Sequence, residues 1–399
     1  MKITAQSSVL GNEISYDFNI PSEMTEAFLY WRPTGDIKEK FGDRYRQIEK
    51  YSESIEGVPQ SVAIIPLLTN ILPLAWLYGC DLHVPSIDSE FLSSASDLRG
   101  AYQRLYPELI FHETSISTNR VTDLFVDEPT SPPLLLYSGG VDAQFSLFAN
   151  IALNPTLVMV RGADVYFTPE DDKAWQLMDS SLNKTASALG VEKITIESSF
   201  KVSLAHWNLS KKFGTLVADN YWHAIQHGPA LIGLLAPIAY KRGCKSIIIS
   251  SSFSYKDPMR VRAGSHPALD ESIRFFGCRI KHCDFTITRQ EKLAHICKSQ
   301  LEAANAIPLR VCWQTRTGKN CCLCEKCLRT IYGLYAENQD PVKFGFAITE
   351  EIEQAIATKI ADPGFKLSVF WNEIIHKLKD CDLQGRNLVY ALLRARDKN

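Results

Sequence analysis

Two stretches of this 399-residue chain carry residue types at spacings that could do chemistry, and the first is a glycine turn. The apolar residues 134–137 lead into Ser138-Gly139-Gly140-Val141-Asp142, and an amphipathic pattern follows. This pattern predicts a buried strand that runs into a helix N-terminus, where unpaired backbone N–H groups and the helix dipole favour an anion. Asp142 falls in the first helical turn, where its carboxylate could hold a magnesium ion that bridges phosphates. The stretch therefore predicts a phosphate-binding loop, and a turn without a ligand is the alternative.

The second stretch is a cluster of closely spaced cysteines. Cys312, Cys321, Cys324 and Cys327 are separated by eight, two and two residues. This spacing allows four thiolates to surround a zinc ion tetrahedrally. Cys322 lies too close to Cys324 for the usual chelating turn, so we expect it to be a spare thiol. Four protein ligands leave no open position, which predicts structural zinc, with an iron–sulfur cluster as the alternative.

Further polar candidates flank the strand predicted at residues 246–250. A basic loop beside a phosphate site could neutralise phosphates or hold a carboxylate substrate. A histidine ahead of a helix could contact nucleotide or substrate. These candidates are His227, Lys256, Arg260, Arg262, His266 and Asp270. The alternative is a solvated loop and a histidine that only caps or packs.

Strand and helix patterns alternate from residue 134 to about residue 305, which predicts an α/β fold with a doubly wound parallel sheet. Strands are expected at 134–137, 156–160, 193–197 and 246–250. Helices are expected at 142–152, 171–189, 229–242 and 288–304. The glycine turn lies at the carboxyl end of the first strand, where such sheets bind ligands.

The remaining segments predict three further parts around this α/β domain, which spans residues 131–305. An N-terminal α+β domain covers 1–130, with a hairpin around Gly11-Asn12, helical residues 60–106, strand within 108–126, and a proline-rich linker at 127–133. A zinc knuckle and its following helix cover 306–340, and a helical tail covers 341–399. An apolar stripe in the tail predicts a packed core face: Leu367, Phe370, Trp371, Ile374, Ile375 and Leu378.

Composition limits the classes of function. A formal net charge of −2 argues against a polyanion as the main partner, so no nucleic acid is expected. The N-terminus shows no signal-peptide pattern, and clustered cysteines then indicate metal in a reducing, cytoplasmic setting. The most apolar run, residues 62–79, contains Pro66 and Pro73 and predicts a kinked core helix and not a membrane span.

The Ser-Gly-Gly-x-Asp motif resembles the pyrophosphate-binding (PP) loop of the ATP pyrophosphatase superfamily. Together with the cysteine spacing that follows it, residues 134–335 resemble the 7-cyano-7-deazaguanine synthase family of queuosine biosynthesis. The resemblance implies an adenine nucleotide alpha hydrolase-like fold that uses ATP and magnesium to activate the carboxylate of 7-carboxy-7-deazaguanine. Ammonia then gives an amide, which a second ATP dehydrates to the nitrile. The loop residues would bind pyrophosphate and magnesium, the four cysteines zinc, and Arg329 the substrate.

Departures from the family pattern point to a different acceptor. Ala143 stands where the family has a hydroxyl residue, and Ser146, one turn on, could replace it. About 130 N-terminal and 50 C-terminal residues have no counterpart in the compact synthases, which resembles the enlarged relatives in anti-phage operons. That resemblance implies an amide bond to the amine of a partner protein, docked on the N-terminal domain, and the enzyme could be a homodimer. The alternatives are the housekeeping nitrile synthase, a PP-loop tRNA-modifying enzyme and a non-catalytic nucleotide sensor.

Overall fold

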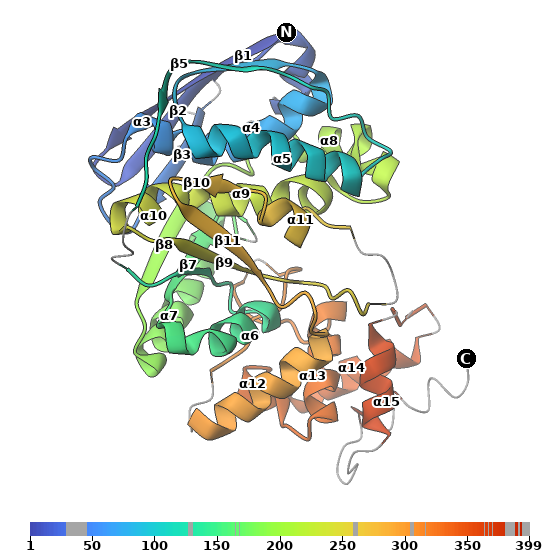
Figure 1. Cartoon of the computed structure of the whole chain (residues 1–399). Helices are drawn as coiled ribbons and strands as arrows, with labels where there is room; N and C mark the ends of the chain where they lie inside the picture. Colours follow the sequence, from blue (N-terminus) through green and yellow to red (C-terminus); the bar gives the residue numbers. More distant parts are fainter. Residues whose placement is uncertain are drawn as a thin grey trace.

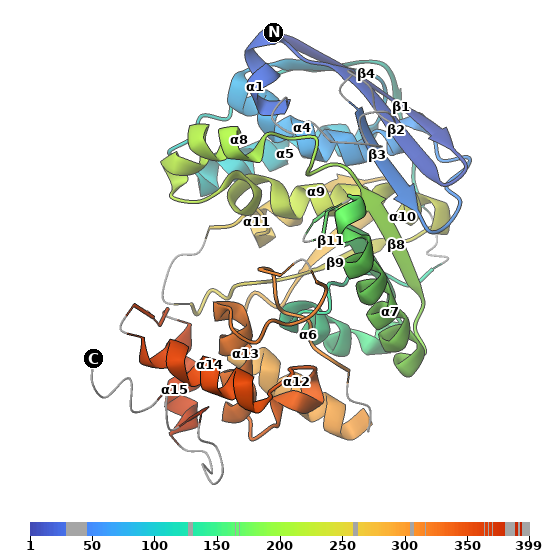
Figure 2. The ribbon, with the colours of Figure 1, turned by 180° about the vertical axis from the view of Figure 1, so that it is seen from behind.

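The computed structural model describes residues 1–28, 46–126, 131–163, 165–166, 168–257, 262–303, 307–315, 317–362, 364–365, 367–368, 370–379, 388–389 and 392. These residues form an α/β protein around one mixed sheet of 11 strands, in the order β10-β11-β9-β6-β7-β8-β3-β2-β1-β4-β5 (Figure 1). Strands β1–β5 lie at one end of the molecule and helices α12–α15 at the other in both Figure 1 and Figure 2.

Five neighbouring strands of the sheet are parallel. They are β6 (Leu134–Leu136), β7 (Thr156–Arg161), β8 (Lys193–Ser198), β9 (Ser246–Ser250) and β11 (Cys278–Cys283). Strand β6 lies between β7 and β9, so the strand order reverses there and leaves a crevice beyond its carboxyl end. The four strands predicted in this region are confirmed, and β11 was missed.

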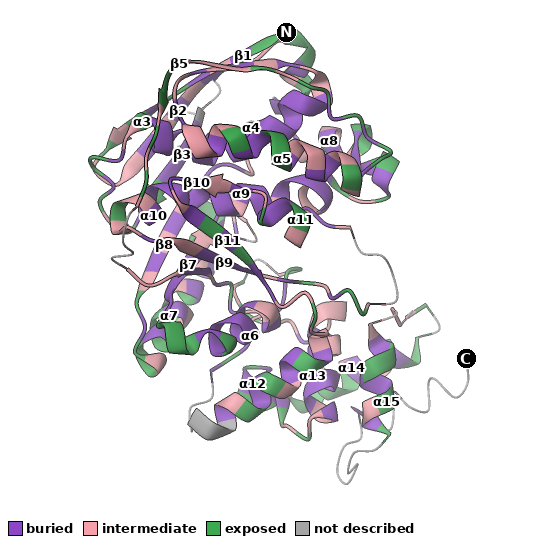
Figure 3. Cartoon of the chain, viewed as in Figure 1, coloured by how far each residue is buried: buried purple, intermediate pink, exposed green. Residues whose placement is uncertain are grey.

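The helices of this region also follow the predicted pattern. They are α6 (Val141–Ala149), α7 (Asp172–Leu189), α9 (His227–Leu234) and α10 (Ala236–Arg242). The short helices α8 (His206–Lys212) and α11 (Pro267–Asp270) were not predicted. Gly190 and Gly243 end α7 and α10 with φ angles of +66° and +65°, as a C-terminal glycine does. The predicted start at Pro229 is wrong, because a π-helix, Trp222–Gln226, already precedes α9. Figure 3 shows exposed residues along α7, whereas α6 is buried over most of its length.

The strands of the N-terminal segment extend the same sheet. The predicted hairpin is confirmed as β1 (Lys2–Leu10) and β2 (Glu13–Asn19), which pair antiparallel. Strand β3 (Arg46–Tyr51) then pairs with β8, with Glu49 opposite Ser198. Hydrogen bonding within the sheet therefore crosses the boundary predicted near residue 130.

The helical residues expected over 60–106 are present, but a strand that was not predicted divides them. Helices α3 (Gln60–Ala63), α4 (Ile65–Tyr78) and α5 (Ser89–Leu105) are interrupted by strand β4 (Asp81–Asp88). Strand β4 pairs with β1 and with β5 (Ile116–Thr122), so partners distant in sequence override the local helical pattern.

Helix α4 is a core helix, as its apolar sequence predicted. It is buried from Ile65 to Leu77 and packs on α9 so closely that a Cβ atom on Gly233 would lie 2.0 Å from Thr69 Oγ1. Asn70 Oδ1 accepts a hydrogen bond of 2.7 Å from Gln226 Nε2 across the same contact. Within the described residues, no helix has both the length and the apolar character that crossing a membrane requires.

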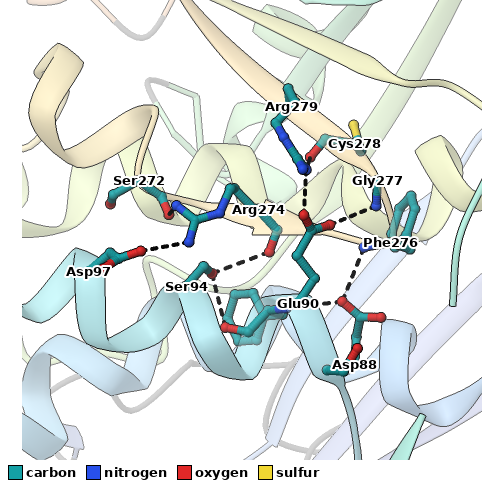
Figure 4. A network of polar contacts seen from close by, with 12 residues as sticks. Asp88, Glu90, Ser94, Asp97, Ser272, Arg274, Phe276, Gly277, Cys278 and Arg279 are labelled. Carbon is teal, nitrogen blue, oxygen red and sulfur yellow. Dashed lines mark hydrogen bonds and ion pairs between the residues drawn. The ribbon is translucent and has the colours of Figure 1, made fainter. Parts of the chain in front are cut away.

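A polar network ties α5 to strands β10 (Arg274–Phe275) and β11 (Figure 4). Asp88 accepts hydrogen bonds from the backbone N–H groups of Phe91 and Phe276, at 3.0 and 3.1 Å. Glu90 accepts from Gly277 N at 2.6 Å and pairs with Arg279 at 2.6 Å. The N-terminal segment is thus joined to the parallel strands by β3 on one side and by α5 on the other.

The C-terminal helices follow from α12, which packs on α6, while α13 packs on α12 and α15 on α13. They are α12 (Arg289–Ala303), α13 (Glu325–Ala336), α14 (Glu350–Ala361) and α15 (Trp371–Leu378). The capping box that predicted the start of α12 is confirmed, with Thr288 N donating to Glu291 Oε2 (2.7 Å) and Glu291 N donating to Thr288 Oγ1 (3.2 Å). The packed-core prediction for the tail is confirmed at Trp371, Ile374, Ile375 and Leu378, which are buried.

Candidate functional site

The glycine turn forms a loop between β6 and α6 that a distant segment holds in place. Gly139 has φ +78°, a left-handed conformation that glycine adopts without steric cost, and Gly140 caps α6. The N–H of Arg310 donates to Gly139 O at 2.8 Å, and Arg310 Nε donates to Ser138 O at 3.4 Å. These contacts fix the loop at the crevice where the strand order reverses.

A cavity opens at this loop, which we call the loop cavity. One part of its wall is apolar and comes from β7 and α9, including Met159, Val160 and Leu231. The other part is polar and includes the loop itself, His227, Arg289, Arg310 and Lys326. The cavity suits a ligand with a flat apolar part and an anionic end.

Asp142 lines the loop cavity beside cationic side chains. Its Oδ2 is 2.8 Å from Arg289 Nη1, and its Oδ1 is 3.4 Å from Lys292 Nζ. Burial alone would raise the pKa of Asp142, but Arg289, Lys292, Lys326 and Arg329 outweigh it and hold the pKa below the usual carboxyl value. The cations Arg289, Arg310 and Lys326 line the loop cavity with Asp142, so the cavity favours a further anion.

The environment of Asp142 bears on the magnesium prediction. Both carboxylate oxygens already contact cationic side chains, so a magnesium ion bound here would have to displace Arg289 or Lys292. Sequence analysis missed both of these residues, because they come from α12, 147 and 150 residues away. No local motif marked them as part of a site.

Arg329 of α13 lies close to Arg289. Burial, followed by the charge of Arg289, lowers the pKa of Arg329 to about 10. Its side chain is 13% exposed, and its guanidinium lies over the Phe370 ring with 4.9 Å to the ring centre. The predicted substrate residue is therefore brought to the cationic cluster.

The four predicted cysteines come together as a group that could hold a metal ion such as zinc. The Sγ atoms of Cys312, Cys321, Cys324 and Cys327 all lie within 4.8 Å of one another, and two of the pairs are 3.9 Å apart. Zinc–sulfur bonds of about 2.3 Å in a tetrahedron place sulfurs about 3.8 Å apart, so the donor set fits zinc. The spare-thiol prediction for Cys322 fits as well, because its Sγ is outside the group.

Backbone N–H groups support these sulfurs. Cys324 N donates to Cys321 Sγ at 3.2 Å, and Cys327 N donates to Cys324 Sγ at 3.4 Å. Such hydrogen bonds stabilise thiolates and orient metal ligands.

Asn320 links the cysteine group to the loop cavity. Its Oδ1 accepts from Val311 N at 2.9 Å and from Cys312 N at 3.3 Å, and its Nδ2 donates to Leu309 O at 2.8 Å. The segment 309–312 held in this way carries Arg310, which contacts the glycine loop. Sequence analysis missed Asn320, although its place directly before two cysteines was an available signal.

Other predicted site residues lie at or near the loop cavity. His227 lines it and meets the Trp222 ring edge-on at 4.9 Å. Lys256 pairs with Glu291 at 2.9 Å beside a neighbouring cavity. Ala143 lines the loop cavity with a methyl group, whereas Ser146 is buried and contacts the Cys283 thiol.

Three predicted residues have structural partners away from the loop cavity. Arg262 pairs with Glu108 at 2.7 Å. His266 caps α11, its Nδ1 accepting from Ala268 N at 3.1 Å. Asp270 is buried between Ser265 Oγ (2.9 Å) and His282 Nδ1 (2.7 Å), and burial raises its pKa. Arg260 lies outside the described residues.

No family model matches the chain, and no curated protein or solved structure matches it. Its class is therefore defined by fold and site alone. It is an α/β protein with a mixed sheet, a cationic cavity at a glycine loop, and four cysteines that could hold a metal.

Proposed function

We propose that this protein is an ATP-dependent carbon–nitrogen ligase with a PP-loop fold, in which β11, β9, β6, β7 and β8 form the doubly wound sheet. One observation carries the proposal. The Ser138–Asp142 loop leaves β6 at the reversal of strand order and opens into a cavity lined by both apolar and cationic side chains. An adenine nucleotide combines a flat apolar base with an anionic chain, which is the matching chemistry.

The residues then take distinct roles in nucleotide binding. The base would lie along Met159, Val160 and Leu231, and the phosphates would contact the N–H groups of the glycine loop and the cations Arg310 and Lys326. Asp142 would hold magnesium that arrives with the nucleotide, after it exchanges its contacts with the α12 cations. Magnesium would neutralise charge on the departing pyrophosphate.

The proposed reaction has two balanced steps. A carboxylate oxygen of the substrate attacks the α-phosphorus of ATP, and pyrophosphate leaves to give an acyl adenylate. An amine nitrogen then attacks the acyl carbon, AMP leaves, and the nitrogen loses a proton as the amide forms. Holding both reactants in one cavity lowers the entropic part of the barrier.

We propose 7-carboxy-7-deazaguanine as the acid and an amine of a partner protein as the acceptor, in an anti-phage setting. Support for the protein acceptor comes from the segments outside residues 134–335, which add strands β1–β5 at one end and α14 and α15 at the other. Ammonia as acceptor, with nitrile as the product, is the second candidate, since the added segments can also serve stability alone.

Product analysis tests the proposal. The protein is incubated with ATP, magnesium and 7-carboxy-7-deazaguanine, with and without each co-encoded protein, and nucleotides and intact protein masses are measured. We expect AMP, pyrophosphate and a mass gain on one partner. ADP as the product would refute the ligase assignment, and nitrile with every partner mass unchanged would refute the protein acceptor.

A matched pair of variants tests the site. Asp142→Asn should lower turnover by orders of magnitude, because it removes the carboxylate from the second position of α6. Glu351→Gln changes the corresponding position of α14, where the carboxylate is exposed, and should leave turnover unchanged. Equal turnover of the two variants would contradict a catalytic role for Asp142.

A further inference from the structure

A second cavity lies between α12, α13 and α15, and we call it the tail cavity. Its lining includes Arg289, Arg329, Phe370 and Glu373. Arg289 also lines the loop cavity, so the two cavities share this residue. Phe370 and Glu373 lie in the C-terminal tail, beyond the residues that carry the family resemblance.

The two arginines of the tail cavity have unused hydrogen-bond donors. Nε and Nη2 of Arg289 and Nε of Arg329 are buried and have no hydrogen-bond partner among the described residues. The carboxylate nearest to Arg329 Nε, on Glu325, is 3.7 Å away, which is too long for a hydrogen bond. Buried unpaired donors on cations are unfavourable, and a ligand carboxylate would satisfy them in a charge-assisted, bidentate manner.

The tail cavity also offers an aromatic ring and two carboxylates, those of Asp257 and Glu373. Phe370 is half-buried, 6.2 Å from the Phe253 ring centre, and Leu293 and Ile374 add apolar lining. Glu373 accepts a hydrogen bond of 2.9 Å from Thr288 Oγ1, and burial raises its pKa. A carboxyl group is the natural partner for the adjacent ring N–H and amino donors of a guanine-type heterocycle.

We propose that the tail cavity binds the acid substrate, a planar heterocyclic carboxylate of the 7-carboxy-7-deazaguanine type. The heterocycle packs against the Phe370 ring beside Arg329, its N–H and amino edge faces Glu373, and its carboxylate lies between Arg329 and Arg289. Because Arg289 also contacts Asp142 at the glycine loop, the carboxylate is presented to the α-phosphate of a bound nucleotide. The identity of the acid rests on the proposed function, whereas its binding needs no turnover.

Equilibrium binding by calorimetry tests the site. Affinity for 7-carboxy-7-deazaguanine is measured without nucleotide and with a non-hydrolysable ATP analogue, for the unaltered protein and for Arg329→Gln, Phe370→Leu and Glu373→Gln. We expect Arg329→Gln to weaken binding by about 10- to 100-fold, the range for a lost charge-assisted hydrogen bond. The affinity for the ATP analogue alone should not change.

Two comparisons separate recognition from general destabilisation. Arg262→Gln is the matched control, because Arg262 also pairs with a carboxylate and lies over an aromatic ring, that of Tyr106 at 5.4 Å, away from both cavities. It should bind the acid as tightly as the unaltered protein does. Glu373→Gln should lose the preference for the acid over its analogue without the 2-amino group, an effect that a folding defect does not produce.

The outcomes distinguish this site from the proposed reaction. If all three tail variants bind the acid more weakly, the site is supported. If the unaltered protein also forms no AMP, the ligase reaction is overturned while the site stands. AMP formation with acid affinity unchanged in all three variants overturns the site and leaves the reaction standing. Absence of acid binding to the unaltered protein, with and without the ATP analogue, overturns the site.

Discussion

Glu49 on β3 is a fully buried carboxyl group whose ionisation should set the pH dependence of stability. It is 0% exposed and lies opposite Ser198, where the N-terminal strands join the parallel strands. Burial raises the pKa of Glu49 to about 8, against hydrogen bonds from Ser198 and Gln47 that lower it. The folded protein therefore keeps this carboxyl protonated over a pH range in which the unfolded chain has released the proton.

The sign and size follow from linkage. The unfolded pKa is 4.5 and the folded pKa about 8, so raising the pH between these values favours unfolding. Each pH unit in this range lowers the free energy of unfolding by about 1.4 kcal/mol. Because the effect levels off above the folded pKa, the loss between pH 5.5 and 8.5 is about 3 kcal/mol. Glu49→Gln removes the titration while keeping an acceptor for Gln47 Nε2, whose hydrogen bond to Glu49 Oε1 is 2.5 Å long.

Urea unfolding at pH 5.5 and 8.5 measures the effect. The unaltered protein should lose about 3 kcal/mol more than Glu49→Gln on going to the higher pH. Glu13→Gln, on the neighbouring strand β2 at a partly exposed position, is the control and should follow the unaltered protein. Parallel pH dependence in the unaltered protein and in Glu49→Gln would refute the argument.

Three further predictions concern the metal group and the packing. Purified protein should contain about one zinc per chain by elemental analysis and lose it in Cys324→Ser, because four thiolates complete the tetrahedron; zinc far below one equivalent with no iron would contradict this. Asn320→Ala should weaken both metal retention and ATP binding, since it frees the segment that holds Arg310 on the glycine loop, whereas Asn183→Ala, exposed on α7, should change neither. Gly233→Ala should lower the free energy of unfolding by about 1–3 kcal/mol, because its methyl group would clash with Thr69. Gly100→Ala is the control, because its methyl group meets only the end of the Arg104 side chain. Equal stability of the two variants in urea would contradict a rigid contact between α4 and α9.

The sequence by itself determined features that depend on neighbouring residues. The glycine turn after β6, the capping box at Thr288 and the cysteine spacing were all recognisable because each acts within one short segment, through backbone conformation, local hydrogen bonds or chelation. The apolar strands β6, β7 and β9 were also predicted, since strands buried on both faces have nearly continuous apolar sequences. Strand β8 was predicted from its alternating sequence.

The tertiary structure alone decided which charged residues share a site. Arg289 and Lys292 reach Asp142 from 147 and 150 residues away, while Arg262 pairs with Glu108 across 154 residues and so leaves the site where sequence placed it. The same holds for β3, whose pairing with β8 joins Glu49 to Ser198 and buries a carboxyl group in the sheet. Such contacts depend on how elements distant in sequence pack together. The local sequence around a charged residue or a strand is the same whether that residue or strand meets a partner or faces water.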